Sequence, residues 1–173
     1  MIHYNANRGA SYARNTGYNY SVADWILFLD DDVEPDQSIL DAYVGALKRY
    51  PEAKVLAGLT ELPGAVNTWT SMLRACNVGY FYGVSKRMRH PPWAVTANLM
   101  VRGSRFNPTI QFKECYPKTG GGEDIDFVYQ YKRFYLSTPS LAVTASVPEA
   151  GESNDLTTAI LSVTSHALNT WCV

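Results

Sequence analysis

The hydrophobic positions of this chain follow two patterns, one continuous and one spaced three or four residues apart. Residues 24–29, DWILFL, contain a continuous apolar run that is typical of a strand buried on both faces of a sheet. In residues 36–50 the apolar side chains recur with helical spacing, and Pro51 ends the predicted helix. Residues 54–59, KVLAGL, predict a second strand. Strand, helix and strand in succession form a βαβ unit, so we expect an α/β fold with a mostly parallel sheet flanked by helices.

The same alternation continues on both sides of this unit. Residues 9–17 predict a short helix, with Gly17 in the left-handed position that ends it. Further along, residues 93–102 predict a strand, residues 123–134 a helix and residues 140–147 a last strand. From residue 151 the chain is poorer in large apolar side chains, and its pattern predicts no element.

Composition narrows the class of protein. A chain of 173 residues corresponds to about one domain, and 46% hydrophobic residues are typical of a globular one. The formal net charge of -1 argues against a nucleic-acid partner. The 3 cysteines are scattered, which predicts neither a disulfide framework nor a zinc site and fits a reducing, cytoplasmic location. No apolar run approaches the roughly 20 residues that a membrane helix needs.

Three consecutive carboxylates, Asp30, Asp31 and Asp32, follow the first predicted strand. In open α/β sheets, ligands bind beyond the carboxyl ends of the strands. Carboxylate oxygens suit Mg²⁺ or Mn²⁺, which commonly take one or two protein carboxylates together with substrate phosphate. In extended backbone, Asp30 and Asp32 would point to the same side and Asp31 elsewhere. The alternative is a solvated acidic turn before the next helix, with Asp36 as its N-cap.

A second acidic group follows a run of glycines in residues 119–127, TGGGEDIDF. Glycines allow backbone angles that other residues avoid, and they allow a close approach to a ligand. A carboxylate offered there by Glu123 or Asp124 could act as a general base towards a bound hydroxyl. The alternative is that these acids only complement the helix dipole.

Together these segments resemble the family-2 glycosyltransferases, which have the GT-A fold. NRGASYARNTG, at residues 7–17, is similar to the family's Asn-x-Gly…Ala-Arg-Asn-x-Gly stretch. ILFLDDDVEPD is similar to its strand and Asp-x-Asp metal motif, GGGEDIDF to its Gly-Gly-Glu-Asp-x-Asp-Phe motif, and NLMVRGSRF to the strand and loop before that motif. The resemblance covers residues 1–135 and implies transfer of a sugar from a nucleotide-sugar donor to a hydroxyl or carbohydrate acceptor, with inversion.

Residue by residue, the resemblance implies a role for each acidic cluster. Asp30 and Asp32 would ligate a divalent cation, Mn²⁺ or Mg²⁺, at the donor diphosphate, and Asp30 would also lie near the ribose. Asp124 would be the catalytic base, and Glu123 would bind the acceptor or hold Asp124 in place. The residues expected to contact the donor are Asn7, Arg14, Asp30 and Asp31. For Arg14, a place on the helix surface is an open alternative.

The chain also departs from the family's usual pattern. Relatives begin with a strand, a turn, a helix and a second strand that carries a nucleotide-binding acid, whereas this chain begins in the middle of that half. Residues 143–151 lack the histidine that many relatives carry, and Gln130 stands where relatives often have an arginine. We therefore expect an N-terminally truncated fragment, with a partial glycosyltransferase domain at residues 1–149 and an unassigned segment at residues 150–173. Membrane association, at a cytosolic face, is expected only through segments outside this sequence.

Two other functions stay open at this point. A non-catalytic module of the same fold would bind a carbohydrate or a partner without transferring a sugar. A Mg²⁺-dependent phosphotransferase would also place Asp-x-Asp after a strand, but it gives no reason for the second acidic cluster.

Overall fold

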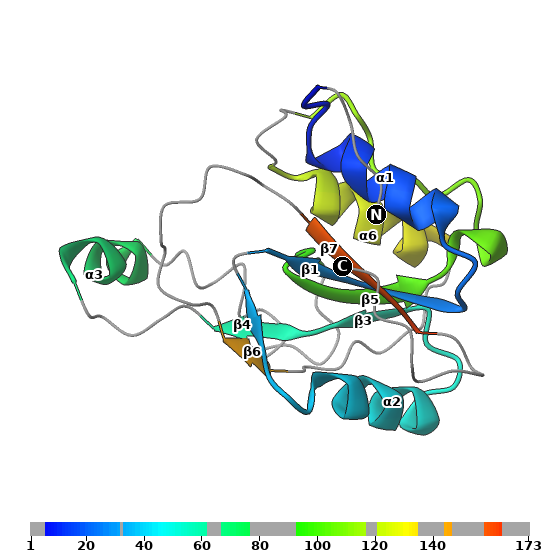
Figure 1. The fold of residues 1–173 in the computed structure, drawn as a ribbon, viewed down its shortest axis with the longest axis horizontal. Helices are drawn as coiled ribbons and strands as arrows, with labels where there is room; N and C mark the ends of the chain where they lie inside the picture. The colour runs from blue at the N-terminus through cyan, green and yellow to red at the C-terminus, as the bar shows by residue number, and fades with distance from the viewer. Residues whose placement is uncertain are drawn as a thin grey trace.

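The computed structural model describes residues 6–31, 33–61, 67–76, 93–116, 121–134, 144–146 and 158–163. Figure 1 shows its helices and strands in chain order, which are α1 (Ala10–Tyr20), β1 (Trp25–Asp30), β2 (Glu34–Pro35), α2 (Ile39–Arg49), β3 (Val55–Ala57), β4 (Leu59–Glu61), α3 (Thr68–Ala75), β5 (Asn98–Arg102), the 3-10 turn η1 (Ser104–Phe106), α6 (Glu123–Phe134), β6 (Thr144–Ser146) and β7 (Thr158–Val163). No helix among these residues is both long enough and apolar enough to span a bilayer.

The described strands form two sheets. β1 lies inside the larger one, whose strand order is β3-β5-β1-β7. In its register, Leu27 of β1 is opposite Met100 of β5 and Leu161 of β7. The smaller sheet has the order β2-β6-β4.

The α/β class is confirmed, but the expected mostly parallel pairing is wrong for the described strands. β1 pairs antiparallel with β5 and β7, and β3 pairs antiparallel with β5. Within the described ranges, the parallel pair is β4 with β6. Because β1 and β3 are both antiparallel to β5, they run in the same direction, as the βαβ pattern predicts. β5 lies between them, and the hydrophobic pattern of a strand does not encode its neighbour.

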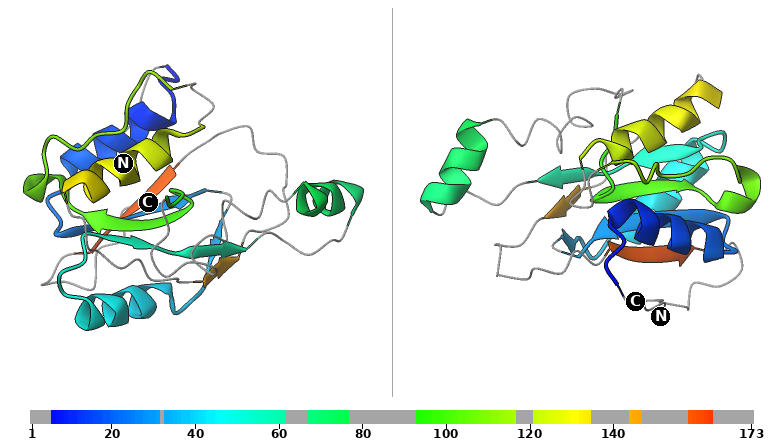
Figure 2. Two further views of the ribbon diagram at one scale, coloured as in Figure 1. Left: turned by 180° about the vertical axis from the view of Figure 1, so that it is seen from behind. Right: turned by 90° about the horizontal axis from the view of Figure 1, so that it is seen from above.

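Helices cover both faces of the larger sheet. α1 and α6 lie side by side on one face and α2 lies on the other, as the views in Figures 1 and 2 agree. Successive side chains of β1 point to opposite faces. Phe28 packs with Tyr18 of α1 and Phe127 of α6, whereas Leu27 packs with Tyr43 of α2. This two-sided burial explains why β1 reads as a continuous apolar run.

Several predicted boundaries shift in the structure. The helix predicted at residues 123–134 coincides with α6, but α1 continues past Gly17 to Tyr20. Gly17 is therefore inside the helix, where its carbonyl accepts a hydrogen bond from the Ser21 N–H, and its predicted role as the helix end is wrong. The strand predicted at residues 54–59 is divided at Gly58 into β3 and β4. β5 occupies the second half of the predicted 93–102 strand.

The turn before α2 is built by Asp36. Its Oδ1 atom accepts hydrogen bonds from the Ser38 backbone N–H at 2.8 Å and from the Ser38 hydroxyl at 2.5 Å. These bonds lower the pKa of Asp36. Ser38 holds the N-cap position, so the predicted N-cap role of Asp36 is wrong, and Asp36 instead orders the turn two residues before the N-cap.

Candidate functional site

Asn7 prepares the start of α1. Its Oδ1 atom accepts a hydrogen bond of 2.8 Å from the Gly9 N–H, and Gly9 has a φ of 89°. That left-handed angle favours glycine, so the Asn-x-Gly sequence has a local structural reason. The structure thus places Asn7, which the resemblance assigns to donor binding, at the turn that leads into α1.

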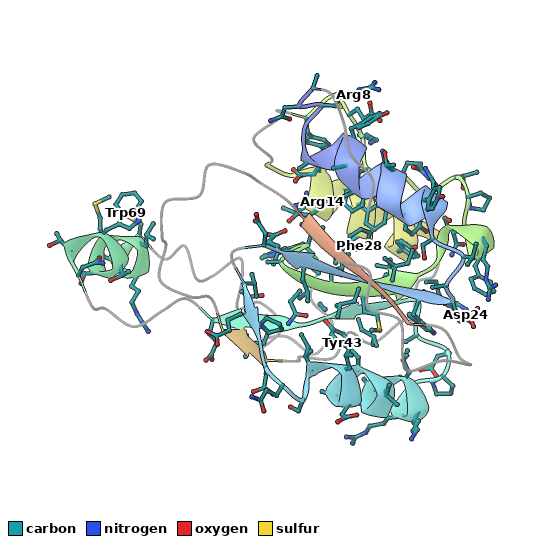
Figure 3. All side chains as sticks on the ribbon, in the orientation of Figure 1. Arg8, Arg14, Asp24, Phe28, Tyr43 and Trp69 are labelled. Atoms are coloured by element: carbon teal, nitrogen blue, oxygen red, sulfur yellow. The ribbon has the colours of Figure 1, made fainter. Side chains whose placement is uncertain are left out.

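Arg14 is a buried cation at the carboxyl end of β1. Only 6% of the residue is exposed, so the alternative of a surface helix residue is wrong. Its Nη1 donates to Glu123 Oε1 at 2.6 Å, and its Nη2 donates to Asp30 Oδ1 at 3.2 Å. Figure 3 shows Arg14 extending from α1 towards this end of β1, with Asp24 at the other end. A buried charge needs such partners, because solvation by water is lost.

Glu123 connects this cation to the glycine turn. The residue is 4% exposed, and its second oxygen, Oε2, accepts a hydrogen bond of 2.6 Å from the Gly121 N–H. Gly121 and Gly122 have φ values of 128° and 94°. Other residues rarely adopt these angles, which explains the need for glycine before α6. Both carboxylate oxygens of Glu123 are therefore bonded within the protein.

Asp124 follows in the first turn of α6 and is half-buried. Its Oδ1 atom accepts a hydrogen bond of 2.8 Å from the Ile125 N–H. Burial raises the pKa of Asp124, and the neighbouring Glu123 charge raises it further, whereas the Ile125 N–H and the positive charge of Arg14 oppose this rise. A carboxyl group with a raised pKa suits proton transfer better than an ordinary surface aspartate does.

The acids after β1 are only partly described. Asp30 is the last residue of β1 and is half-buried, and Asp31 is exposed just beyond it. Asp32 lies outside the described residues, so the predicted common side of Asp30 and Asp32 stays a prediction. Among the described residues, no group of three or more His, Cys, Asp or Glu side chains could hold a metal ion.

The charges still suit a cation. Asp30 and Glu123 share one guanidinium, and Asp31 and Asp124 are their immediate neighbours in the chain. The carboxylates of these two segments outnumber the one guanidinium, which leaves an excess of negative charge. Hard oxygen donors of this kind fit Mg²⁺ or Mn²⁺, which need only one or two protein carboxylates. The donor set is therefore compatible with the divalent cation that the resemblance implies.

Further contacts fix the helix that carries Arg14, and the sequence reading missed them. Asn15 bonds both backbone groups of Phe112, donating from Nδ2 to the carbonyl at 2.7 Å and accepting from the N–H at 2.8 Å. The Tyr18 and Tyr131 hydroxyls lie 2.6 Å apart, and their oxygens lie 3.2 and 2.7 Å from the Arg102 carbonyl oxygen, so the two hydroxyls and the carbonyl share hydrogen bonds. A signal was present, because Ser11, Arg14 and Tyr18 follow helical spacing along the buried face of α1.

Gln130 has a structural role in α6. Its Nε2 donates to the Gln111 carbonyl at 2.8 Å and to Asp126 Oδ2 at 2.9 Å, and its Oε1 accepts from the Gln111 N–H at 3.2 Å. These bonds tie α6 to the segment that follows η1. They are separate from the hydrogen bonds of Arg14 and Glu123.

Comparison with known proteins gives a match for the first part of the chain. A sequence model described as Glycosyl transferase family 2 matches residues 1–108, which is more than half of the 173 residues. The matched span includes Arg14 and Asp30 and ends before the glycine turn and α6. No curated protein and no solved structure matches the chain.

Proposed function

Because the chain belongs to glycosyl transferase family 2, we propose that its site transfers a sugar from a nucleotide-sugar donor to a hydroxyl acceptor, with inversion at the anomeric carbon. One observation carries this proposal: Arg14 bonds both Asp30, at the end of β1, and Glu123, at the start of α6. The two acidic clusters, which lie far apart in the sequence, therefore meet at one site. Sugar transfer needs such a site, with the donor diphosphate held on one side and a base on the other.

The donor side is formed by the carboxyl end of β1. We assign Asp30 and Asp32 as the residues that would hold a divalent cation, with Asp31, Arg14 and Asn7 nearer the nucleotide. When bound, the cation supplies charge neutralisation for the diphosphate that leaves. The excess of carboxylates supports this assignment, because a diphosphate would otherwise be repelled from the site.

The acceptor side is formed by the start of α6. The acceptor hydroxyl oxygen attacks the anomeric carbon on the face opposite the diphosphate. The new carbon–oxygen bond forms as the bond to the diphosphate breaks, and Asp124 takes the hydroxyl proton. A single displacement of this kind inverts the anomeric centre. Glu123 holds the turn before Asp124, since both of its oxygens are bonded to protein groups.

The test is a matched pair of aspartate-to-asparagine variants. Asp124→Asn keeps the side-chain shape and removes the proton acceptor, so transfer from a panel of nucleotide sugars should fall about 10²–10⁴-fold. Donor affinity, measured by calorimetry with Mn²⁺ present, should barely change. The control is Asp41→Asn, an exposed aspartate in the first turn of α2, which should leave both quantities unchanged.

Two outcomes would contradict the proposal in different ways. Donor binding without detectable transfer by the wild-type chain would favour a non-catalytic binding module. Loss of donor affinity in Asp124→Asn, with turnover preserved, would make Asp124 a binding residue instead of the base.

A further inference from the structure

We propose that Arg14 is a positioning residue, which holds Glu123, and through it the Gly121–Gly122 turn, in the arrangement that presents Asp124 to the acceptor. The proposal rests on the proposed function, since it explains how the base of that reaction is placed. It assigns Arg14 to the acceptor side of the site as well as to the donor side.

The contacts form an uninterrupted series from α1 to the turn. Arg14 Nη1 donates to Glu123 Oε1 at 2.6 Å, and the Gly121 N–H donates to Glu123 Oε2 at 2.6 Å. Both are short, charge-assisted hydrogen bonds, which are stronger than bonds between neutral groups. With Arg14 and Glu123 both more than nine-tenths buried, water competes little for either partner.

An arginine is needed at position 14 because the two terminal nitrogens of its guanidinium bond two different carboxylates. Nη1 bonds Glu123 while Nη2 bonds Asp30, so one side chain connects the glycine turn to the end of β1. A lysine ammonium is a point charge and has no planar fork to engage two carboxylates in fixed directions. Arg14 Nε is buried and has no acceptor among the residues that the structure describes.

The body of the protein holds Arg14 in place. In the part of α1 that follows it, Asn15 bonds the Phe112 backbone, and Tyr18 bonds Tyr131 and the Arg102 carbonyl. α1 is thereby attached both to α6 and to the segment after η1. These contacts fix the position of α1, and with it the backbone of Arg14, relative to the sheet.

The turn is the part that needs an external constraint. Gly121 and Gly122 can adopt many backbone conformations, and the observed φ values of 128° and 94° are only one choice. The bond from the Gly121 N–H to Glu123 selects this choice. α6 begins at Glu123, so a change in the turn would move Asp124, the next residue.

The first measurement needs no enzymatic activity. Amide hydrogen exchange at Gly121 should speed up at least tenfold in Glu123→Gln, whose side-chain amide can no longer accept two charge-assisted bonds. Arg14→Met should have a similar effect, and Arg14→Lys an intermediate one. The control is Lys113→Met, which removes the other ion pair of the first turn of α6, Lys113 with Asp126, and should leave Gly121 unchanged.

The second measurement is the pH profile of transfer. Burial is the main cause of the raised pKa of Asp124; the charged groups acting on it are Glu123, which raises it further, and Arg14, which lowers it. The acid limb of kcat should therefore move to higher pH in Arg14→Lys or Arg14→Met, because the cation is displaced or lost. In Glu123→Gln it should move to lower pH, with kcat reduced and the donor KM nearly unchanged.

The two measurements separate the possible failures. Absence of transfer by the wild-type chain would overturn the proposed function, and the exchange at Gly121 would still test the role of Arg14. Unchanged Gly121 exchange in folded Arg14→Lys and Glu123→Gln would overturn the positioning role. Shifts of both pH profiles in the same direction would also overturn it, since that result indicates a general loss of structure.

Discussion

At the scale of single residues, Asp124 connects the stability of the chain with its proposed chemistry. Burial raises its pKa from the ordinary value of 3.8, chiefly because the ionised carboxylate loses contact with water. The folded state therefore binds this proton more tightly than the unfolded state does. A carboxylate held in this way accepts a proton more readily than an exposed aspartate does.

The raised pKa predicts how stability changes with pH. Ionised Asp124 is a cost to the folded state, so the wild-type chain should lose stability relative to Asp124→Asn as pH rises from 3.8 through the raised pKa. Urea denaturation of both proteins between about pH 3 and 7 measures the difference, from which the other carboxylates largely cancel. A difference that stays constant, or that changes in the opposite direction, would contradict the assigned burial of this carboxyl group.

At the scale of elements, the division between β3 and β4 requires a glycine, as the turn before α6 does. A Cβ atom at Gly58 would overlap the side chain of Asn98, which is fully buried at the start of β5. Asn98 Oδ1 accepts a hydrogen bond of 2.6 Å from the Tyr43 hydroxyl, and its Nδ2 donates to the Leu59 carbonyl at 3.2 Å. One buried amide thus joins α2, β4 and β5.

Gly58→Ala should therefore destabilise the chain by about 1–3 kcal/mol, because the added methyl group has no room and would displace Asn98. The matched control is Gly45→Ala in α2, where a Cβ would have nothing within 4 Å. That change should stabilise the chain by about 0.5–1 kcal/mol, as alanine is the better helix former. Urea denaturation measures both effects. Equal effects at the two positions would contradict the packing described around Asn98.

The elements that the sequence predicts well are those with a strong local period. The sequence of β1 predicts a strand because both of its faces are buried. The start of α6 at Glu123 is predictable because the glycines before it favour a turn over a helix. The direction of strand pairing could not be predicted, since β5 enters between β3 and β1 without changing the pattern of either. The helix α3 was missed, although Asn67 and Thr70 form a capping box at its start.

The sequence predicts which acidic residues form the candidate site, but it does not predict which residues they contact. The position of Asp30 follows from the end of an apolar strand, and that of Asp124 from a glycine turn before a helix. The partners of Arg14 did not follow, because its two ion pairs join residues that are close only after α1 and α6 pack on the same face. Its helical spacing with Ser11 and Tyr18 was the available sign that it is buried.

At the scale of the whole molecule, the chain is nearly neutral while its site is not. The formal net charge is -1 over 173 residues, yet Asp30 and Glu123 both pair with the guanidinium of Arg14, and each has a further aspartate next to it in the chain, Asp31 and Asp124. The attraction for a cation is therefore local to the carboxyl end of β1. The helix layer formed by α1 and α6 holds two of these residues, since α1 carries Arg14 and α6 carries Glu123.

This local charge predicts that a cation and a nucleoside diphosphate stabilise the folded chain together. A ligand that binds only the folded state at 100 times its Kd adds about 2.7 kcal/mol, which for a domain of this size raises Tm by roughly 5–10 °C. Mn²⁺ with a nucleoside diphosphate should produce this rise in a thermal melt, and either one alone should produce less. Asp32→Ala should abolish it, because the proposed cation ligand is lost, while Asp41→Asn should retain it. A full rise in Asp32→Ala would show that Asp32 is not a cation ligand, and a full rise with the diphosphate alone would show that the anion binds without a metal.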